Sequence, residues 1–311
     1  MSAHLRVVEQ YPGIVSRCRW HALDEAGGYS GAEVWRGELD GEPLFALKRW
    51  PNDFSAARLR QIHTLIATAQ HLPFVPRILP TLERDTLVDA DGCIWDVCTW
   101  MPGEACLQSP SETRLKAACA AIGQLHDVWK PHRPTFAPCP AVERRLRLFD
   151  TWEASTHQSN YEGLWKEAAM LLRDGIPPAR QALQPWRVRP LPLQHCLADI
   201  HREHVLFTGD TITGIIDYGA MKIDNVAADA ARYLGDAASN DRPLFNHGCE
   251  LFARHHGEGI CPVELIAVLD RTGTLAAIAN WLLKDERSAR IETRLARLVE
   301  RCKRLLPNRL E

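Results

Sequence analysis

The chain has 311 residues, a formal net charge of −2, 46% hydrophobic and 24% charged residues. This mixture is typical of a soluble globular protein, and the near-neutral charge gives no reason to expect nucleic acid or an acidic membrane as partner. No apolar run approaches the roughly 20 residues that span a bilayer, and the N-terminus lacks the apolar core of a secretory signal. Ten cysteines without a C-x-x-C pair favour buried reduced thiols. We therefore expect a cytoplasmic protein.

The first hundred residues are mostly strand-like. Residues 34–39 and 43–50 flank an Asp-Gly turn and predict a β-hairpin, and residues 85–89 and 93–100 predict a second one. The second arm of the first hairpin places Phe45 and Leu47 on one face and Lys48 on the other. We expect a five-stranded antiparallel sheet here.

One helix accompanies this sheet. Residues 55–72 place four apolar side chains on one face at helical spacing: Leu59, Ile62, Ile66 and Ala69. Beyond Met101-Pro102-Gly103 the sequence becomes helical, and Ser109 to Glu112 has the serine, proline and glutamate of a helix start.

Helices are also expected at about 141–156 and 160–173, after a loop at 131–140 that contains four prolines. A connection rich in proline and arginine follows, then a β-hairpin within residues 205–216. From about residue 224 onward the sequence predicts only helices and loops.

That hairpin lies between two aspartates. Asp199 precedes its first strand and Asp217 follows its second. The strand ends opposite a hairpin turn are neighbours, so the spacing predicts two carboxylates at one edge, where a divalent cation with substrate phosphates would offset their repulsion. The alternative is that each aspartate caps a separate turn.

Two features upstream fit a phosphate site. Gly27, Gly28, Ser30 and Gly31 form a glycine-rich turn ahead of a strand, where backbone N–H groups can approach phosphates. Lys48 interrupts an otherwise apolar strand, where an ammonium group requires an anion. An ordinary turn and a snorkelling lysine explain either feature alone. The order glycine turn, strand lysine, hinge and two aspartates is much harder to obtain by chance.

In this order the chain resembles the aminoglycoside phosphotransferase and choline kinase family, the small-molecule kinases of the protein-kinase-like fold. The family's catalytic stretch reads roughly H-G-D-x-H-x-x-N-V-L, and residues 197–206 read LADIHREHVL. The family's I-x-G-[IV]-I-D-[FWY]-[GE] is matched by ITGIIDYG at 212–219. Residues 100–104 resemble the family's hinge and residues 122–126 the helix after it. The resemblance covers about residues 15 to 240.

The resemblance implies an α+β, two-lobe fold with a small antiparallel β-sheet lobe, one helix in it, and a larger helical lobe carrying the inserted hairpin. The corresponding boundaries are residues 1–98 for the N-terminal lobe, 99–103 for the hinge and 104–311 for the C-terminal lobe. It also implies that His201 and Asp229 support the site structurally.

The resemblance further implies ATP-dependent transfer of the γ-phosphate to a hydroxyl of a small molecule. Asp199 would be the catalytic aspartate, Asp217 a ligand of Mg²⁺ or Mn²⁺, and Lys48 a contact of the α- and β-phosphates. Trp100 and Met101 would receive the adenine. The acceptor and the oligomeric state stay open. Because the overall charge is near neutral, we favour a metabolic alcohol over a polycationic antibiotic.

Three departures from the family pattern bear on catalysis. The metal-binding asparagine is His204, and an imidazole suits softer metals better than magnesium. The histidine and glycine before the catalytic aspartate are Leu197 and Ala198. The lysine's glutamate partner aligns with Gln61, which can hydrogen-bond a lysine and cannot neutralise it. The alternative to a kinase is therefore a pseudokinase, a nucleotide- or ligand-binding module with a degraded metal site.

Overall fold

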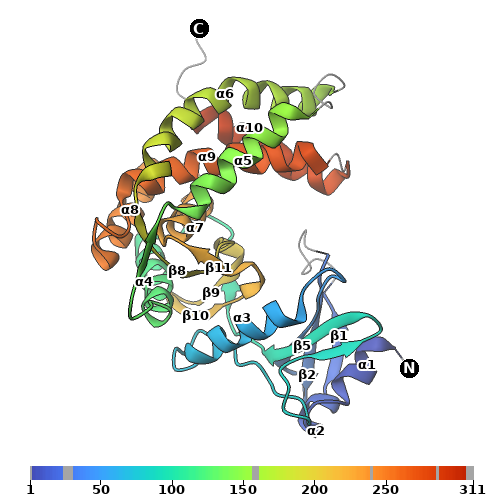
Figure 1. Cartoon of the computed structure of the whole chain (residues 1–311). Helices are drawn as coiled ribbons and strands as arrows, with labels where there is room; N and C mark the ends of the chain where they lie inside the picture. The colour runs from blue at the N-terminus through green and yellow to red at the C-terminus, as the bar shows by residue number, and fades with distance from the viewer. Residues whose placement is uncertain (1, 24–30, 156–160, 239–240, 285–286, 306–311) are drawn as a thin grey trace. The chain divides into compact units, whose positions relative to one another are not determined.

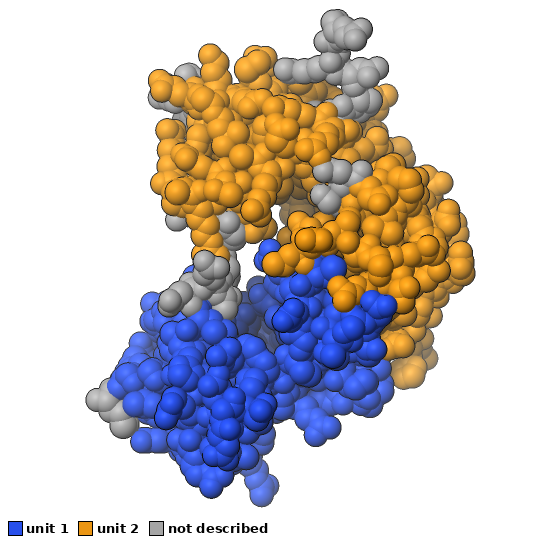
Figure 2. Space-filling view, turned by 180° about the vertical axis from the view of Figure 1, so that it is seen from behind, with its two compact units in different colours: residues 1–106, 203–219 blue, residues 107–202, 220–311 orange. Residues whose placement is uncertain are grey.

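The computed structural model describes residues 2–23, 31–155, 161–238, 241–284 and 287–305 (Figure 1). The chain forms two compact units, shown in separate colours in Figure 2. Unit 1 comprises residues 1–106 and 203–219, and unit 2 comprises residues 107–202 and 220–311. The hairpin segment 203–219 thus belongs to the β-rich unit by its contacts. Among the described residues, no helix has both the length and the apolar character needed to cross a membrane.

Unit 1 is built on a five-stranded antiparallel sheet in the order β1-β2-β3-β5-β4, which confirms the expected sheet. Its strands are β1 (Arg19–Ala22), β2 (Glu33–Leu39), β3 (Glu42–Arg49), β4 (Val88–Ala90) and β5 (Cys93–Thr99). Asp40 and Gly41 both have positive φ, at 54° and 88°, which closes the tight β2–β3 hairpin. Phe45 and Leu47 enter the core of this unit.

Among the described residues of unit 1, three helices accompany this sheet, where the sequence predicted one. The expected helix is α3 (Ala56–Thr68), capped by the Ser55 side chain. The prediction missed α1 (Ala3–Val8) and α2 (Gly13–Ser16). These short helices and the connection between them bury apolar side chains in the same core cluster as Phe45 and Leu47: Val7, Val8, Tyr11 and Val15. Tertiary packing stabilises helices that are too short to be predicted from periodicity.

A second sheet in unit 1 has the order β10-β9-β6. It contains the predicted hairpin, β9 (Val205–Thr208) and β10 (Thr211–Ile215), and β6 (Glu104–Ala105) pairs with β9. Gly103, just before β6, has a φ of +98°, and a Cβ there would lie 2.7 Å from the carbonyl oxygen of Phe207. Only glycine allows the chain to run this close to the hairpin.

Unit 2 is mainly helical. Its central helix is α9 (Val263–Lys284), which is apolar on most sides and has buried residues along its length. The other helices are α4 (Glu112–Val128), α5 (Pro140–Ala154), α6 (Gly163–Val188), α7 (Ala227–Ala237), α8 (Arg242–His256) and α10 (Ala289–Leu305). A small sheet, β11-β8-β7, joins β7 (Thr135–Ala137), β8 (Leu191–Cys196) and β11 (Lys222–Asp224). Beyond residue 224 the described residues contain only helices and loops, as predicted.

Two expectations for unit 2 were wrong. Helix α6 does not end near residue 173 but continues through Pro177, Pro178 and Pro185. An interior proline costs about 3 kcal/mol, and burial of a continuing apolar stripe that includes Ile176 and Leu183 offsets that cost. The segments expected as loop or connection contain β7 and β8, because these short strands are recognisable only through their pairing with each other.

Candidate active site

The loop before Asp199 has a strained backbone that buried hydrogen bonds hold in place. It follows β8, and Ala198 has a φ of +67°, in the left-handed region that costs a non-glycine residue roughly 1–2 kcal/mol. The backbone N–H groups of Leu197 and Ala198 each donate to the Asp229 carboxylate at 2.7 Å. Asp229 lies in the first turn of α7 and is fully buried. The departure from glycine at Ala198 therefore preserves the backbone conformation that glycine adopts without strain.

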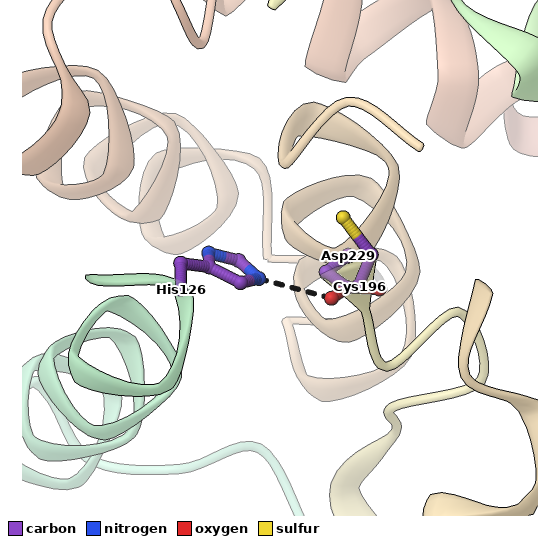
Figure 3. A group of neighbouring side chains, drawn as sticks. All are labelled: His126, Cys196 and Asp229. Carbon is purple, nitrogen blue, oxygen red and sulfur yellow. Dashed lines mark hydrogen bonds and ion pairs between the residues drawn. The ribbon is translucent and has the colours of Figure 1, made fainter. Parts of the chain in front are cut away.

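Helix α4 contributes a third hydrogen bond to the same carboxylate. His126 Nε2 lies 2.9 Å from Asp229 Oδ2, as Figure 3 shows. A carboxylate can only accept here, so Nε2 carries the hydrogen, and in the neutral imidazole Nδ1 is the acceptor. His256 Nε2, 3.1 Å from His126 Nδ1, is then the donor. A hydrogen-bond network thus runs from α8 through α4 and α7 to the backbone before Asp199.

Among the described residues of unit 2, two groups of side chains have the composition of metal ligands. The first is His126, Cys196 and Asp229, and the second is Asp127, His255 and His256. Burial raises the pKa of the Cys196 thiol well above its usual value, and the Asp229 oxygens already accept three hydrogen bonds. In the second group, Asp127 accepts from His255 at 2.9 Å. Hydrogen bonds within the protein account for both groups.

Asp199 has an exposed carboxylate that is ion-paired in unit 2. Its side chain is 53% exposed, and Arg232 Nε lies 2.9 Å from its Oδ1. Arg232 follows Asp229 by three residues on α7. The same helix therefore positions Asp229, which binds the loop backbone, and Arg232, which pairs with Asp199. His201 is half-buried two residues after Asp199.

In unit 1, Lys48 and Asp217 form an ion pair at 2.9 Å although they are 169 positions apart in the sequence. Partial burial would raise the pKa of Asp217, but the charge of Lys48, the nearby His204 and hydrogen bonds outweigh it and lower this pKa to about 2. Asp217 has a φ of 61°, a second non-glycine residue in the left-handed region. The carboxylate is therefore ionised at any physiological pH and held beside a cation.

The hairpin brings His204 and Asp217 together. His204 Nε2 lies 3.7 Å from Asp217 Oδ2, and the Ile216 N–H donates to the His204 carbonyl at 3.0 Å. Two ligands of one ion with bonds of about 2.1 Å stand roughly 3–4 Å apart, so this imidazole and carboxylate fit a shared divalent cation. Asp199 belongs to unit 2, and its proximity to Asp217 stays a prediction.

The remaining predicted site residues are placed as follows. Gly27, Gly28 and Ser30 lie outside the described residues. Gly31, with a φ of +73°, stands just before β2. The backbone N–H of Trp100 donates to the Leu44 carbonyl at 2.8 Å, and Met101 is buried. Gln61 is exposed on α3, so a role beside Lys48 stays a prediction.

Sequence reasoning missed three residues near Lys48. Trp50, Asp96 and His63 are all buried and joined by hydrogen bonds. A signal was present, because Asp96 interrupts the apolar strand CIWDVCT just as Lys48 interrupts its own. The two positions are cross-strand neighbours in β3 and β5, which only the register reveals.

The chain is similar in sequence and in fold to known phosphotransferases. The chain is 26% identical over 245 residues to an aminoglycoside 3'-phosphotransferase of Streptomyces ribosidificus, covering 76% of this chain and 88% of that protein. An aminoglycoside phosphotransferase from Alicyclobacillus acidocaldarius has a similar structure, with a TM-score of 0.66 at 15% identity over 96% of this chain and 92% of that one. An amicoumacin kinase in complex with AMP-PNP, Ca²⁺ and Ami gives a TM-score of 0.65 at 14% identity over 94% and 90%.

These similarities confirm the expected two-lobe kinase-like fold. The sequence model described as the phosphotransferase enzyme family matches residues 25–254, which is well over half of the chain. The resemblance drawn from the two aspartate motifs is therefore confirmed, and the chain belongs to the phosphotransferase enzyme family.

Proposed function

We propose that the protein transfers the γ-phosphate of ATP to a hydroxyl group of a small molecule. The observation that carries this proposal is the Lys48–Asp217 ion pair at 2.9 Å, which joins the strand lysine to the aspartate at the hairpin's end. A kinase needs this cation beside the nucleotide phosphates and this carboxylate beside the metal ion. Phosphoryl transfer depends mainly on positioning and charge neutralisation, so few groups suffice.

Each residue then has a defined task. Asp217 and His204 would hold Mg²⁺ or Mn²⁺, which neutralises charge on the phosphates when bound. Lys48 would leave Asp217 for the α- and β-phosphates. Asp199 would accept or orient the proton of the acceptor hydroxyl, and Arg232, 2.9 Å away, would orient that carboxylate. The amicoumacin kinase that holds AMP-PNP and Ca²⁺ supports the use of a nucleotide and a divalent metal ion.

Release of ADP from ATP and Mn²⁺ tests this function, measured against a panel of hydroxylated metabolites and aminoglycosides. Wild type should release ADP with at least one acceptor, and Asp199→Asn should release none while binding manganese-ATP nearly as well. An Asp199→Asn variant with wild-type turnover would remove Asp199 from the mechanism. Hydroxylated metabolites come first in the panel, since a net charge of −2 gives little attraction for a polycation.

A pseudokinase is the second candidate, favoured by His204 in place of the family's asparagine. If wild type binds manganese-ATP and turns over no acceptor, while His204→Asn does, this alternative holds. If His204→Asn only shifts the metal preference toward magnesium, the histidine is a working ligand.

A further inference from the structure

Helix α3 supplies no acid to Lys48. Between Phe54 and Leu82 the sequence has no aspartate or glutamate, so the carboxylate that the family pattern places on this helix is missing. Lys48 nevertheless occupies a defined position, with a side chain only 19% exposed. Other groups on the same face of the sheet must therefore fix it.

Trp50 lies against Lys48 on that face. It follows Lys48 by two residues, and the Lys48 ammonium lies 4.1 Å from the centre of the Trp50 ring. The ring face attracts the ammonium group, and this attraction grows stronger as the cation is desolvated. Trp50 itself is 7% exposed, so its ring is a rigid surface for the lysine rather than a mobile one.

A buried carboxylate fixes the orientation of that ring. The Trp50 indole Nε1 donates to Asp96 Oδ1 at 2.9 Å, and Asp96 Oδ2 lies 2.9 Å from His63 Nε2. Asp96 on β5 is the cross-strand partner of Lys48 and is 6% exposed, while His63 on α3 is 3% exposed. Helix α3 is thus connected to Lys48 through His63, Asp96 and Trp50 in sequence.

The same ring touches the loop that carries Asp217. A Cβ at Gly219 would lie 2.7 Å from the Trp50 ring, so glycine is required for the close approach. The Gly219 N–H points to Asp217 Oδ1 at 3.4 Å. Arg58 on α3 donates to the Gly219 carbonyl at 3.1 Å. Trp50 therefore contacts both the lysine and the loop of its ion-pair partner.

We propose that Trp50 is the positioning residue of Lys48 and that Asp96 and His63 hold Trp50 in place, replacing the acid that α3 lacks. This inference rests on the proposed role of Lys48 in nucleotide binding. It differs from an acid on the helix in one respect. A ring face holds the lysine without neutralising it, so once Lys48 leaves Asp217 no carboxylate on α3 competes with the phosphates for its charge.

The test compares Trp50 with Trp95 on β5. Trp95 is a matched tryptophan on the opposite face of the sheet from Lys48. Trp95 is 2% exposed, its indole N–H donates to the Ala90 carbonyl at 3.3 Å, and a cation, Arg49, lies 5.8 Å from its ring. Trp50→Leu and Trp95→Leu therefore remove similar packing, one beside Lys48 and one away from it. The readout is the dissociation constant of manganese-ATP, measured well below the melting temperature of each variant.

Trp50→Leu should weaken manganese-ATP binding at least tenfold, and Trp95→Leu should change it less than twofold whatever its melting temperature. Trp50→Phe keeps a ring and loses the hydrogen bond to Asp96, so we expect about a threefold loss and partial rescue relative to leucine. If Trp50→Leu does not fold, Trp50→Phe against Trp95→Phe decides, and equal affinities for this pair would overturn the inference. So would a folded Trp50→Leu with wild-type affinity.

Lys48→Ala separates this inference from the proposed function. If Lys48→Ala binds manganese-ATP as wild type does, the nucleotide role of Lys48 fails and this inference fails with it. If Lys48→Ala is weakened tenfold and Trp50→Leu is not, only the positioning role fails. A Lys48→Ala/Trp50→Leu double variant should bind no worse than Lys48→Ala, because Trp50 acts through the lysine.

Discussion

The two acidic loops share one backbone feature and are stabilised in opposite ways. Ala198, before Asp199, and Asp217 itself both have a positive φ, at 67° and 61°. In the first loop a fully buried carboxylate, Asp229, accepts three hydrogen bonds. In the second, a carboxylate that is 40% exposed pairs with Lys48.

The difference indicates which loop is fixed and which can rearrange. Buried hydrogen bonds cannot be replaced by bonds to water, so loss of the first network should lower the free energy of unfolding. A partly exposed ion pair contributes little to stability, and its charges can be redistributed around a metal ion and phosphates. The first loop is thus a structural element, and the second is the loop for which we propose binding of the metal ion.

Removing Asp229 should have the largest effect on stability. Asp229→Ala leaves three buried donors without an acceptor, at about 1–3 kcal/mol each, so we expect a loss of about 3 kcal/mol or more. Asp236→Ala is the control, because Asp236 also accepts a loop N–H, that of Arg202 at 3.0 Å, and is 28% exposed. Denaturant unfolding measures both. Equal losses would contradict the larger contribution to stability that we assign to the buried Asp229 carboxylate.

Lys48→Ala should show the reverse pattern. We expect manganese-ATP affinity to fall at least tenfold, about 1.4 kcal/mol, while the free energy of unfolding changes by less than about 1 kcal/mol. Isothermal titration and denaturant unfolding of the same sample give both numbers. A variant that loses stability and keeps its affinity would make Lys48 a structural residue.

Ala198→Gly should slightly increase the free energy of unfolding. Glycine adopts a φ of +67° without strain, so the variant should gain up to about 1 kcal/mol despite its greater freedom when unfolded. Ala120→Gly, at an exposed position within α4, should instead lose about 1 kcal/mol. If both variants are destabilised alike, the strain assigned to Ala198 is absent.

The smallest expected effect is on the pH dependence of stability. It concerns His256, which is linked to Asp229 through His126. Burial, and then the nearby His126, His255 and Lys130, lower the pKa of His256 to about 3. An unfolded histidine has a pKa near 6.5. Between about pH 6.5 and 3 the unfolded state therefore binds a proton that the folded state does not, and the free energy of unfolding decreases as the pH is lowered. His256→Gln should flatten the decline in melting temperature from pH 7.5 to 5.5. An unchanged decline would assign it to other groups.

The sequence predicted the parts of the fold that local pattern encodes. The β2–β3 hairpin follows from Asp40-Gly41 and its alternating flanks, and the β9–β10 hairpin from the apolar runs around Gly209. The end of α6 was not predictable, since three prolines indicate a break and only burial of the stripe beyond them shows that the helix continues. Likewise α1 and α2 depend on the sheet they cover.

In the candidate site, the sequence identified the charged residues and missed what positions them. Lys48 and Asp217 were found because a charge in an apolar strand and an aspartate after a hairpin are local signals. The link from His63 to Trp50 through Asp96 depends on strand register and on the face of α3, which are tertiary facts. The same holds for Arg232, whose pairing with Asp199 needs α7 to be placed against the loop.

Titration of manganese-ATP into wild type and Asp217→Asn tests the central claim most directly, namely that Asp217 is the metal ligand of a phosphotransferase site. Asparagine keeps the shape of the side chain and removes the charge that pairs with Lys48. The account predicts that wild type binds manganese-ATP, that binding weakens strongly without the metal, and that Asp217→Asn loses it. Metal-dependent binding of wild-type strength by a folded Asp217→Asn variant would contradict the proposed mechanism.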